Sequence, residues 1–191
     1  MSGLYALGVI VLWIVLNLGL WKAWRRIRLG AENNRRRADT VFAVLALAWL
    51  SISFWYGGGR KFYYDAEVRR LCTIDGGVKV YETVNLPADS FNQWGQVNFY
   101  RPDQGESALG SKYLFRSEEK FYRTGNPTLV RYHHEVIRRI DNQKLGETTS
   151  YGRGGGDISG PWVQSNFHCP PTSESSEIAL FKKIFLQLDK G

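Results

Sequence analysis

Two nearly continuous apolar runs open the chain, and a polar region with shorter apolar repeats follows them. The runs cover residues 4–24 and 40–56. A helix needs about 20 apolar residues to cross a hydrocarbon core of ~30 Å, and neither run has the polar stripe of a helix that packs on a soluble core. We therefore predict a transmembrane hairpin over residues 1–59, with a loop over 25–39 between its two spans.

Each run also has an alternative interpretation. The first could be a cleaved signal peptide, but only three residues precede it and the basic cluster follows it, whereas signal peptides carry positive charge in front of the apolar run. The second run is short enough for a buried core helix.

Asn17 interrupts the first run. We expect it to contact the neighbouring span at Ser51 or Ser53, with a functional polar group inside the bilayer as the alternative.

Positive charge is concentrated between the two runs. Residues 22–39 hold seven basic and two acidic residues, whereas residues 57–191 hold 18 basic and 16 acidic residues. The arginines of the loop are Arg25, Arg26, Arg28, Arg35, Arg36 and Arg37. Because basic residues near the ends of spans favour the cytoplasmic side, the loop should be cytoplasmic, and the N-terminus and the C-terminal domain should lie on the opposite side. In a bacterium this arrangement is a multi-pass inner-membrane protein with a periplasmic domain.

The region 60–191 alternates between helix-like and strand-like patterns. Apolar residues at helical spacing predict a helix over 61–73, which ends at Asp75 and two glycines. Alternating apolar and polar residues predict strands over 78–84, 112–117, 119–124, 129–141 and 145–153. With a further helix near the C-terminus, the order is helix, antiparallel sheet, helix. The sequence therefore predicts an α+β domain.

The same pattern indicates where two of these elements begin or end. Glu118 and Glu119 separate two strand-like stretches and are expected in a solvated turn. The last amphipathic helix begins at Ser175 and carries Phe185 and Leu188 on or near its apolar side.

Both cysteines fall in the region that should lie outside the cytoplasm. Cys72 ends the first helix of the domain, and Cys169 precedes the last one. An even number of cysteines in an oxidising compartment favours a disulfide. We predict a Cys72–Cys169 bridge that ties the two ends of the domain together. Two reduced buried thiols would be expected instead if the topology were inverted.

The glycine-rich segment 151–157 does not match a nucleotide-binding motif. It lacks the Lys-Ser/Thr pair of a P-loop, and Pro161 interrupts the helix that a dinucleotide motif needs. We expect a tight exposed loop pinned by Arg153 and Asp157, with contact to a ligand or partner as the alternative.

The histidines do not form a metal-binding pattern. His133 and His134 are adjacent and should point to opposite faces of a strand, so they cannot easily share the convergent ligand set of a zinc site. A nucleophilic pair of Cys169 with a histidine would compete with the disulfide for the same thiol. We therefore predict no metal, no cofactor and no catalytic residue.

Aromatic residues provide the candidate binding surface. Those in excess of what six short strands need are Tyr63, Trp94, Phe99, Tyr100, Tyr122 and Trp162. Aromatic side chains are typical binding anchors, although core packing is the default interpretation in a domain of this size. The candidate partner-binding residues are Tyr151, Arg153, Asp157, Trp162 and Trp94.

Two stretches of the domain resemble a recurring pattern in small uncharacterised bacterial membrane-anchored proteins. The first reads IRRIDNQKLGETTSYGRGGGD, followed by SGPW and SNFHCP, and the second reads LCTIDGGVKVYETVNLP. Together they cover roughly half of the domain. The resemblance implies a bacterial, envelope-associated domain and supplies neither an activity nor catalytic residues.

These observations favour a non-enzymatic accessory or interaction protein of the bacterial inner membrane. Its periplasmic domain would bind a protein or an envelope component. The expected surface is the β-hairpin formed by the strands 129–141 and 145–153, together with the 151–162 loop. We expect membrane lipid and a protein partner in the membrane or periplasm. A nucleic-acid-binding protein would carry a basic face on its folded domain, and this domain is nearly balanced. The alternatives are a membrane-tethered periplasmic enzyme and a sensor subunit that signals through a partner. The sequence sets no oligomeric state.

Overall fold

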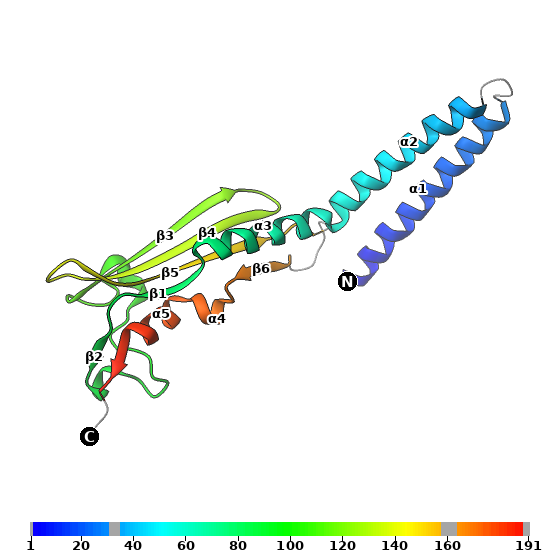
Figure 1. Ribbon diagram of the computed structural model, residues 1–191. Coiled ribbons are helices and arrows are strands. Elements are labelled where there is room, and N and C mark those ends of the chain that lie inside the picture. The colour runs from blue at the N-terminus through cyan, green and yellow to red at the C-terminus, as the bar shows by residue number, and fades with distance from the viewer. Residues whose placement is uncertain (1, 31–34, 158–163, 189–191) are drawn as a thin grey trace. The chain divides into compact units, whose positions relative to one another are not determined.

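The computed structural model describes residues 2–30, 35–157 and 164–188 (Figure 1). The chain divides into two compact units. The first comprises Met1–Phe62 with Gly156–Ser165, and the second comprises Tyr63–Gly155 with Asn166–Gly191.

Two long apolar helices make up most of the first unit. α1 (Ser2–Gly30) and α2 (Arg35–Phe54) run antiparallel and side by side (Figure 1). α2 has no buried residue, and Leu4 and Leu47 are 79% and 65% exposed. Both helices have the length and composition needed to cross a membrane. The pair is therefore compatible with the two predicted spans.

A wide helical turn connects α2 to the next helix. This turn, η1 (Trp55–Gly59), contains Gly58 at a φ of 147°, a conformation that L side chains rarely adopt. Directly after it, Arg60 donates to the backbone oxygens of Gly156 and Asp157 at 3.3 and 3.2 Å. The end of the glycine-rich segment is thus fixed beside the start of α3 (Arg60–Asp75).

The helix predicted over 61–73 is confirmed as α3. It ends at Asp75, and Gly77 follows at a φ of 114°. Gly76 is required by a close approach, because a Cβ there would lie 2.6 Å from the backbone oxygen of Cys72.

The main sheet is antiparallel and has the order β1-β5-β4-β3, with β6 paired to β5. Its strands are β1 (Gly77–Val80), β3 (Tyr113–Arg123), β4 (Thr128–Arg138), β5 (Gln143–Gly154) and β6 (Asn166–Cys169). The predicted turn at Glu118 and Glu119 is wrong. Both residues pair with β4 inside one continuous strand, where their exposed side chains explain the polar pattern.

Two other predicted boundaries are also wrong. The strand predicted over 78–84 ends at Val80, because the next two backbone N–H groups both donate to the Leu145 oxygen, at 2.8 and 3.0 Å. The chain then forms β2 (Val84–Leu86), which pairs in parallel with β7 (Phe185–Gln187). This pairing ends the last helix, α5 (Glu177–Ile184), earlier than its apolar spacing indicates.

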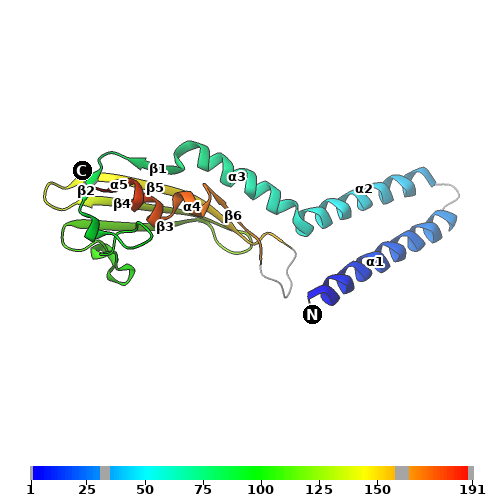
Figure 2. The ribbon, with the colours of Figure 1, turned by 90° about the horizontal axis from the view of Figure 1, so that it is seen from below.

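Helices cover both faces of the main sheet. α4 (Thr172–Ser175) and α5 lie over one face (Figure 2), where the Thr148 hydroxyl donates to the Ser175 backbone oxygen at 3.1 Å. The main residues of this core are Phe115, Val136, Leu145, Leu180, Phe181 and Ile184. Side chains alternate between faces along a strand, so Tyr151 points to the opposite face. There it packs with Leu129 and with Val68 of α3.

Two short 3-10 helices complete the second unit. They are η2 (Ala88–Ser90) and η3 (Pro102–Ser107).

Candidate functional site

Arg153, a candidate partner-binding residue, is the largest fully buried side chain of the described chain and is 1% exposed. Its Nε donates to Asp65 Oδ1 at 2.5 Å, and a second guanidinium nitrogen donates to the Gly155 backbone oxygen. The residue therefore holds α3 against the end of β5. This location corrects the prediction of an exposed loop at this position.

Tyr151 is also buried, at 3% exposure. Its hydroxyl donates to Asp75 at 2.6 Å, and the other carboxylate oxygen of Asp75 accepts from Arg131 at 3.3 Å. Burial is the leading cause that raises the pKa of Tyr151, and the hydrogen bond to Asp75 adds to it. Tyr151 is thus a second attachment point between α3 and the sheet.

The glycines between these residues have structural roles. Gly152 lies against the His168 ring, which a Cβ would approach to 3.0 Å. Gly155 and Gly156 have φ values of 79° and 87°, the left-handed region that glycine adopts readily. The glycine run therefore ends β5 and turns the chain away from the sheet.

The predicted disulfide is present and links Cys72 to Cys169 across a separation of 97 residues. Both cysteines are partly buried beside Leu71 and Phe167, next to the small core beneath α3. The bridge ties the C-terminal half of α3 to β6.

The other candidate binding residues lie in different places. Asp157 accepts from the Ser165 backbone N–H at 2.7 Å and pairs with Lys61 at 3.5 Å, and both of these contacts lie within the first unit. Trp94 is 67% exposed, in a turn closed by Asn92. Trp162 lies outside the described residues.

An open groove lies between α3 and the far end of β3 and β4. This tyrosine groove has a volume of about 420 Å³ and is lined by Tyr63, Tyr64, Glu67, Arg70, Leu71, Tyr122, Arg123 and Leu129. Tyr63 and Tyr122 are 58% and 47% exposed. By contrast, Phe99 and Tyr100 pack against the core beneath α5. The aromatic surplus of the sequence thus divides between core and surface.

The charges of the tyrosine groove leave it positive. Glu67 and Arg70 form a two-point pair at 2.6 and 2.9 Å, which holds the pKa of Glu67 below its ordinary value. The Arg123 guanidinium lies 5.1 Å from the centre of the Tyr64 ring and donates to the Pro127 backbone oxygen. In the described chain Arg123 has no carboxylate partner. Tyrosine and arginine are the residue types enriched in protein interfaces.

A cluster of charged side chains lies on β4 and β5. Glu135 and Glu147 lie opposite each other on β4 and β5, and Lys144 bridges them at 2.8 and 3.1 Å. Burial works to raise the pKa of both carboxyls, but hydrogen bonds from Lys144, and from Arg116 or Tyr81, lower it overall. The pKa of Lys144 is raised, chiefly by Glu135. All three groups therefore stay charged near neutral pH, whereas acid–base catalysis favours groups that titrate there.

The histidines do not converge. His133 pairs with Thr149 at 2.9 Å, while His134 stacks on Phe115, whose ring belongs to the core beneath α5. Burial lowers the pKa of His134. Over residues 2–30, 35–157 and 164–188, no three His, Cys, Asp or Glu side chains form a group that could hold a metal ion.

The hydrogen-bond partners of polar groups on the helical pair differ from those predicted. Asn17 donates to the Trp13 backbone oxygen at 2.7 Å, one turn earlier in the same helix. A hydrogen bond between the two helices instead joins Trp13 Nε1 to the Ser53 hydroxyl at 3.5 Å. The expected contact of Asn17 with Ser51 or Ser53 is therefore wrong, because its own helix offers a nearer acceptor.

The chain matches no protein-family model, no curated protein and no solved structure. The motif resemblance in the sequence therefore assigns no family.

Proposed function

We propose that this protein is a membrane-anchored binding protein of the bacterial inner membrane. α1 and α2 form its transmembrane hairpin, and the α+β domain lies in the periplasm. The domain binds a protein or an envelope component, and no catalytic step is assigned to it. The tyrosine groove is the observation that carries this proposal.

The anchor and the compartment are supported by two independent features. The helices expose large apolar side chains along their whole length, and such surfaces are stable in hydrocarbon but unfavourable in water. The disulfide lies in the other unit, and disulfides persist mainly in oxidising compartments such as the periplasm.

The positive charges that follow the second span fit this topology. Arg60 is bound to backbone oxygens and lies 5.4 Å from the Tyr56 ring, and Lys61 is paired with Asp157. On that side of the membrane, both residues are therefore engaged in contacts within the folded protein. The loop arginines, with seven basic residues against two acidic ones over 22–39, remain the stronger topological signal.

Binding in the groove is supported by its composition. Two exposed tyrosines present flat amphipathic faces, and hot spots of interfaces are enriched in tyrosine and arginine. Leu71 and Leu129 add apolar lining, and Arg123 adds a positive charge without a carboxylate partner in the described chain. An extended segment of a partner protein with an acidic residue is the ligand that this groove fits best.

Site-specific photo-crosslinking in intact cells tests the proposal. A photoreactive phenylalanine derivative at Tyr122 or Tyr63 should give a discrete crosslinked adduct that withstands denaturation. Ile140 is the matched control, because it is 90% exposed and lies in the β4–β5 turn away from the groove.

Specific adducts at both groove positions and none at Ile140 would support binding at the groove. Equal adducts at all three positions, or none at Tyr122 and Tyr63, would contradict it.

A further inference from the structure

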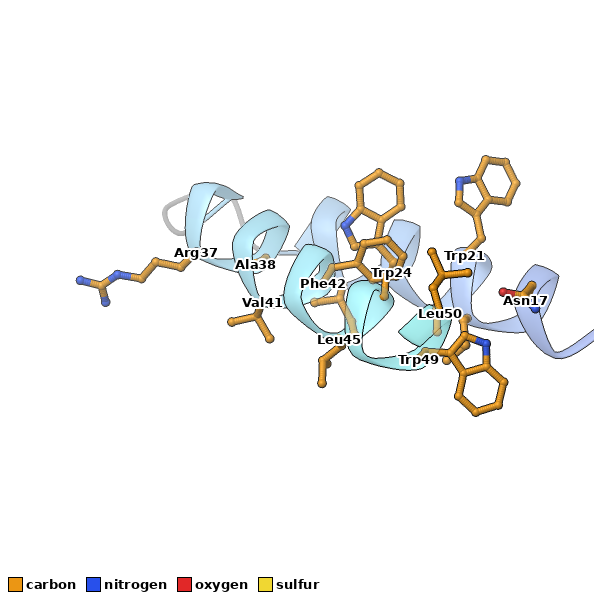
Figure 3. Close-up of a pocket in the computed structure, with 14 residues that line it drawn as sticks. Asn17, Trp21, Trp24, Arg37, Ala38, Val41, Phe42, Leu45, Trp49 and Leu50 are labelled. Carbon is orange, nitrogen blue, oxygen red and sulfur yellow. The ribbon is translucent and has the colours of Figure 1, made fainter. Parts of the chain in front are cut away.

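A long apolar groove runs between α1 and α2 toward their connected ends. It has a volume of about 790 Å³. Its lining is almost wholly apolar, and Asn17 and Arg37 are the polar side chains in it. Figure 3 shows Arg37 at one end of the groove and Asn17 toward the other. Between them, the rings of Trp24 and Phe42 stack at 4.9 Å across the two helices.

Arg37 provides positive charge at its end of the groove, and two other arginines lie over tryptophans along it. The Arg25 guanidinium lies 4.9 Å from the centre of the Trp21 ring, and the Arg28 guanidinium lies 5.2 Å from that of Trp24. Both tryptophans line the groove. Arg28 is shared with Asp39 at 3.4 Å, but among the described residues neither Arg25 nor Arg37 pairs with a carboxylate. The groove thus joins an apolar channel to a positively charged rim.

We propose that this groove is a binding site for an anionic phospholipid of the cytoplasmic leaflet. An acyl chain fills the apolar part, and the headgroup phosphate accepts hydrogen bonds from Arg37 at the rim. This inference rests on the proposed membrane insertion of the hairpin. Basic pockets between transmembrane helices on the cytoplasmic side are known to hold anionic headgroups.

Charge and polarity together favour this occupant. A zwitterionic lipid also carries a phosphate, but its own cationic group offsets that charge, so an anionic lipid neutralises Arg37 better. Guanidinium–phosphate pairs are strong because two N–H groups can bind one phosphate. A second copy of the hairpin would bring its own arginines to the same rim, and like charges repel. An anionic lipid matches both the apolar channel and the charged end.

Lipid titration of the purified full-length protein in nonionic detergent tests the site. Phosphatidylglycerol and phosphatidylcholine with identical acyl chains are compared by native mass spectrometry, and brominated chains report contact by quenching the groove tryptophans. Phosphatidylglycerol should bind more tightly. At roughly 1 kcal/mol per arginine, the Arg37→Gln variant should weaken this binding by roughly fivefold.

A matched charge control separates the site from general attraction. The Arg36→Gln variant removes the same net charge from a position that does not line the groove. It should change phosphatidylglycerol affinity by no more than about twofold if the rim is specific. An equal loss in the two variants would overturn the inference.

A second pair of variants tests the apolar channel without changing charge. Val41 lines the groove and is 58% exposed, whereas Val44 is 60% exposed and does not line it. Val41→Trp should fill the channel and reduce lipid retention, and Val44→Trp should leave it unchanged.

Three results would overturn the inference. They are equal affinity for the two lipids, unchanged retention in Val41→Trp, and a stable detergent-resistant dimer that Val41→Trp dissociates. The last would place a second copy in the groove. Alkaline carbonate extraction of membranes separates the two proposals. Extraction of the protein by carbonate would contradict the proposed membrane insertion. A protein that stays in the membrane but shows no lipid preference would contradict only the lipid site.

Discussion

Buried charged residues impose the strongest constraints on how the elements of the domain pack together. Arg153 is 1% exposed and Asp65 is 8% exposed, so both charges are removed from water. Such a pair adds little net stability compared with apolar residues of similar volume, but an unpaired buried charge is costly. The pair therefore specifies how α3 packs on the sheet.

Asp65→Ala should lower the free energy of unfolding by about 3–5 kcal/mol, because it leaves the Arg153 guanidinium buried without its carboxylate. Urea denaturation of the purified protein measures this loss. The double variant Asp65→Leu/Arg153→Met should lose less than Asp65→Ala alone. A larger loss in the double variant would show that the ion pair itself stabilises the fold.

The cluster around Lys144 predicts a dependence on acid pH. The pKa values of Glu135 and Glu147 are lowered in the fold, so their ionised pairs stabilise it above the unfolded carboxyl value of roughly 4.3. This contribution is lost as the pH falls through the lower folded pKa values. The urea midpoint should therefore decrease as the pH is lowered from about 5 to 3.

Lys144→Met should flatten this acid dependence, because the two carboxyls lose the ammonium that lowers their pKa. Lys182→Met on the exposed side of α5 is the control and should keep the wild-type slope. Parallel slopes in all three proteins would contradict the assignment to this cluster.

At the scale of elements, α3 is the piece that joins the domain together. Its contacts with the sheet include the Asp65–Arg153 pair, the hydrogen bonds that Asp75 accepts from Tyr151 and Arg131, and the disulfide. The helix and both cysteines follow from the sequence pattern. The two ion pairs do not, because sequence alone does not show which strand residues α3 covers.

Removing the disulfide should destabilise the domain without changing its fold. The bridge spans 97 residues, and in the chain-entropy model a loop of this size contributes about 4–5 kcal/mol. Cys72→Ala/Cys169→Ala should lower the free energy of unfolding by up to this amount, measured by urea denaturation. The unmodified protein should lose a similar amount in reductant, whereas the double variant should not respond to reductant. An unchanged midpoint in both cases would contradict the prediction.

At the scale of the whole molecule, topology decides which functions are open to the chain. A periplasmic domain can form the disulfide and meet envelope components, whereas a cytoplasmic one would favour free thiols. The loop arginines are the physical signal for this choice.

Alkaline phosphatase fused after Gly191 should be active, because the enzyme needs the oxidising periplasm for its own disulfides. A green fluorescent protein at the same place, exported through the same route, should stay dark. The same reporters fused after Gly30, the last residue of α1, should give the opposite result. A fluorescent C-terminal fusion with inactive phosphatase would invert the proposed topology.

The sequence by itself determined the long apolar helices, the antiparallel sheet with its small helices, and the cysteine pair. These features depend on local periodicity, on length and on the small number of cysteines, all of which are visible along the chain. The structure confirms α3 and the disulfide, and it shows an apolar helical pair compatible with the predicted spans.

Tertiary structure decided which polar residues are buried and which aromatic residues form a surface. Tyr151 and Arg153 looked like loop residues, but α3 covers them, and Tyr122 became a groove residue because α3 lies beside its strand. The same holds for the parallel pairing that ends α5 at Ile184. Each outcome depends on contacts between segments that are far apart in the chain. The free energy of these contacts cannot be inferred from the local sequence pattern.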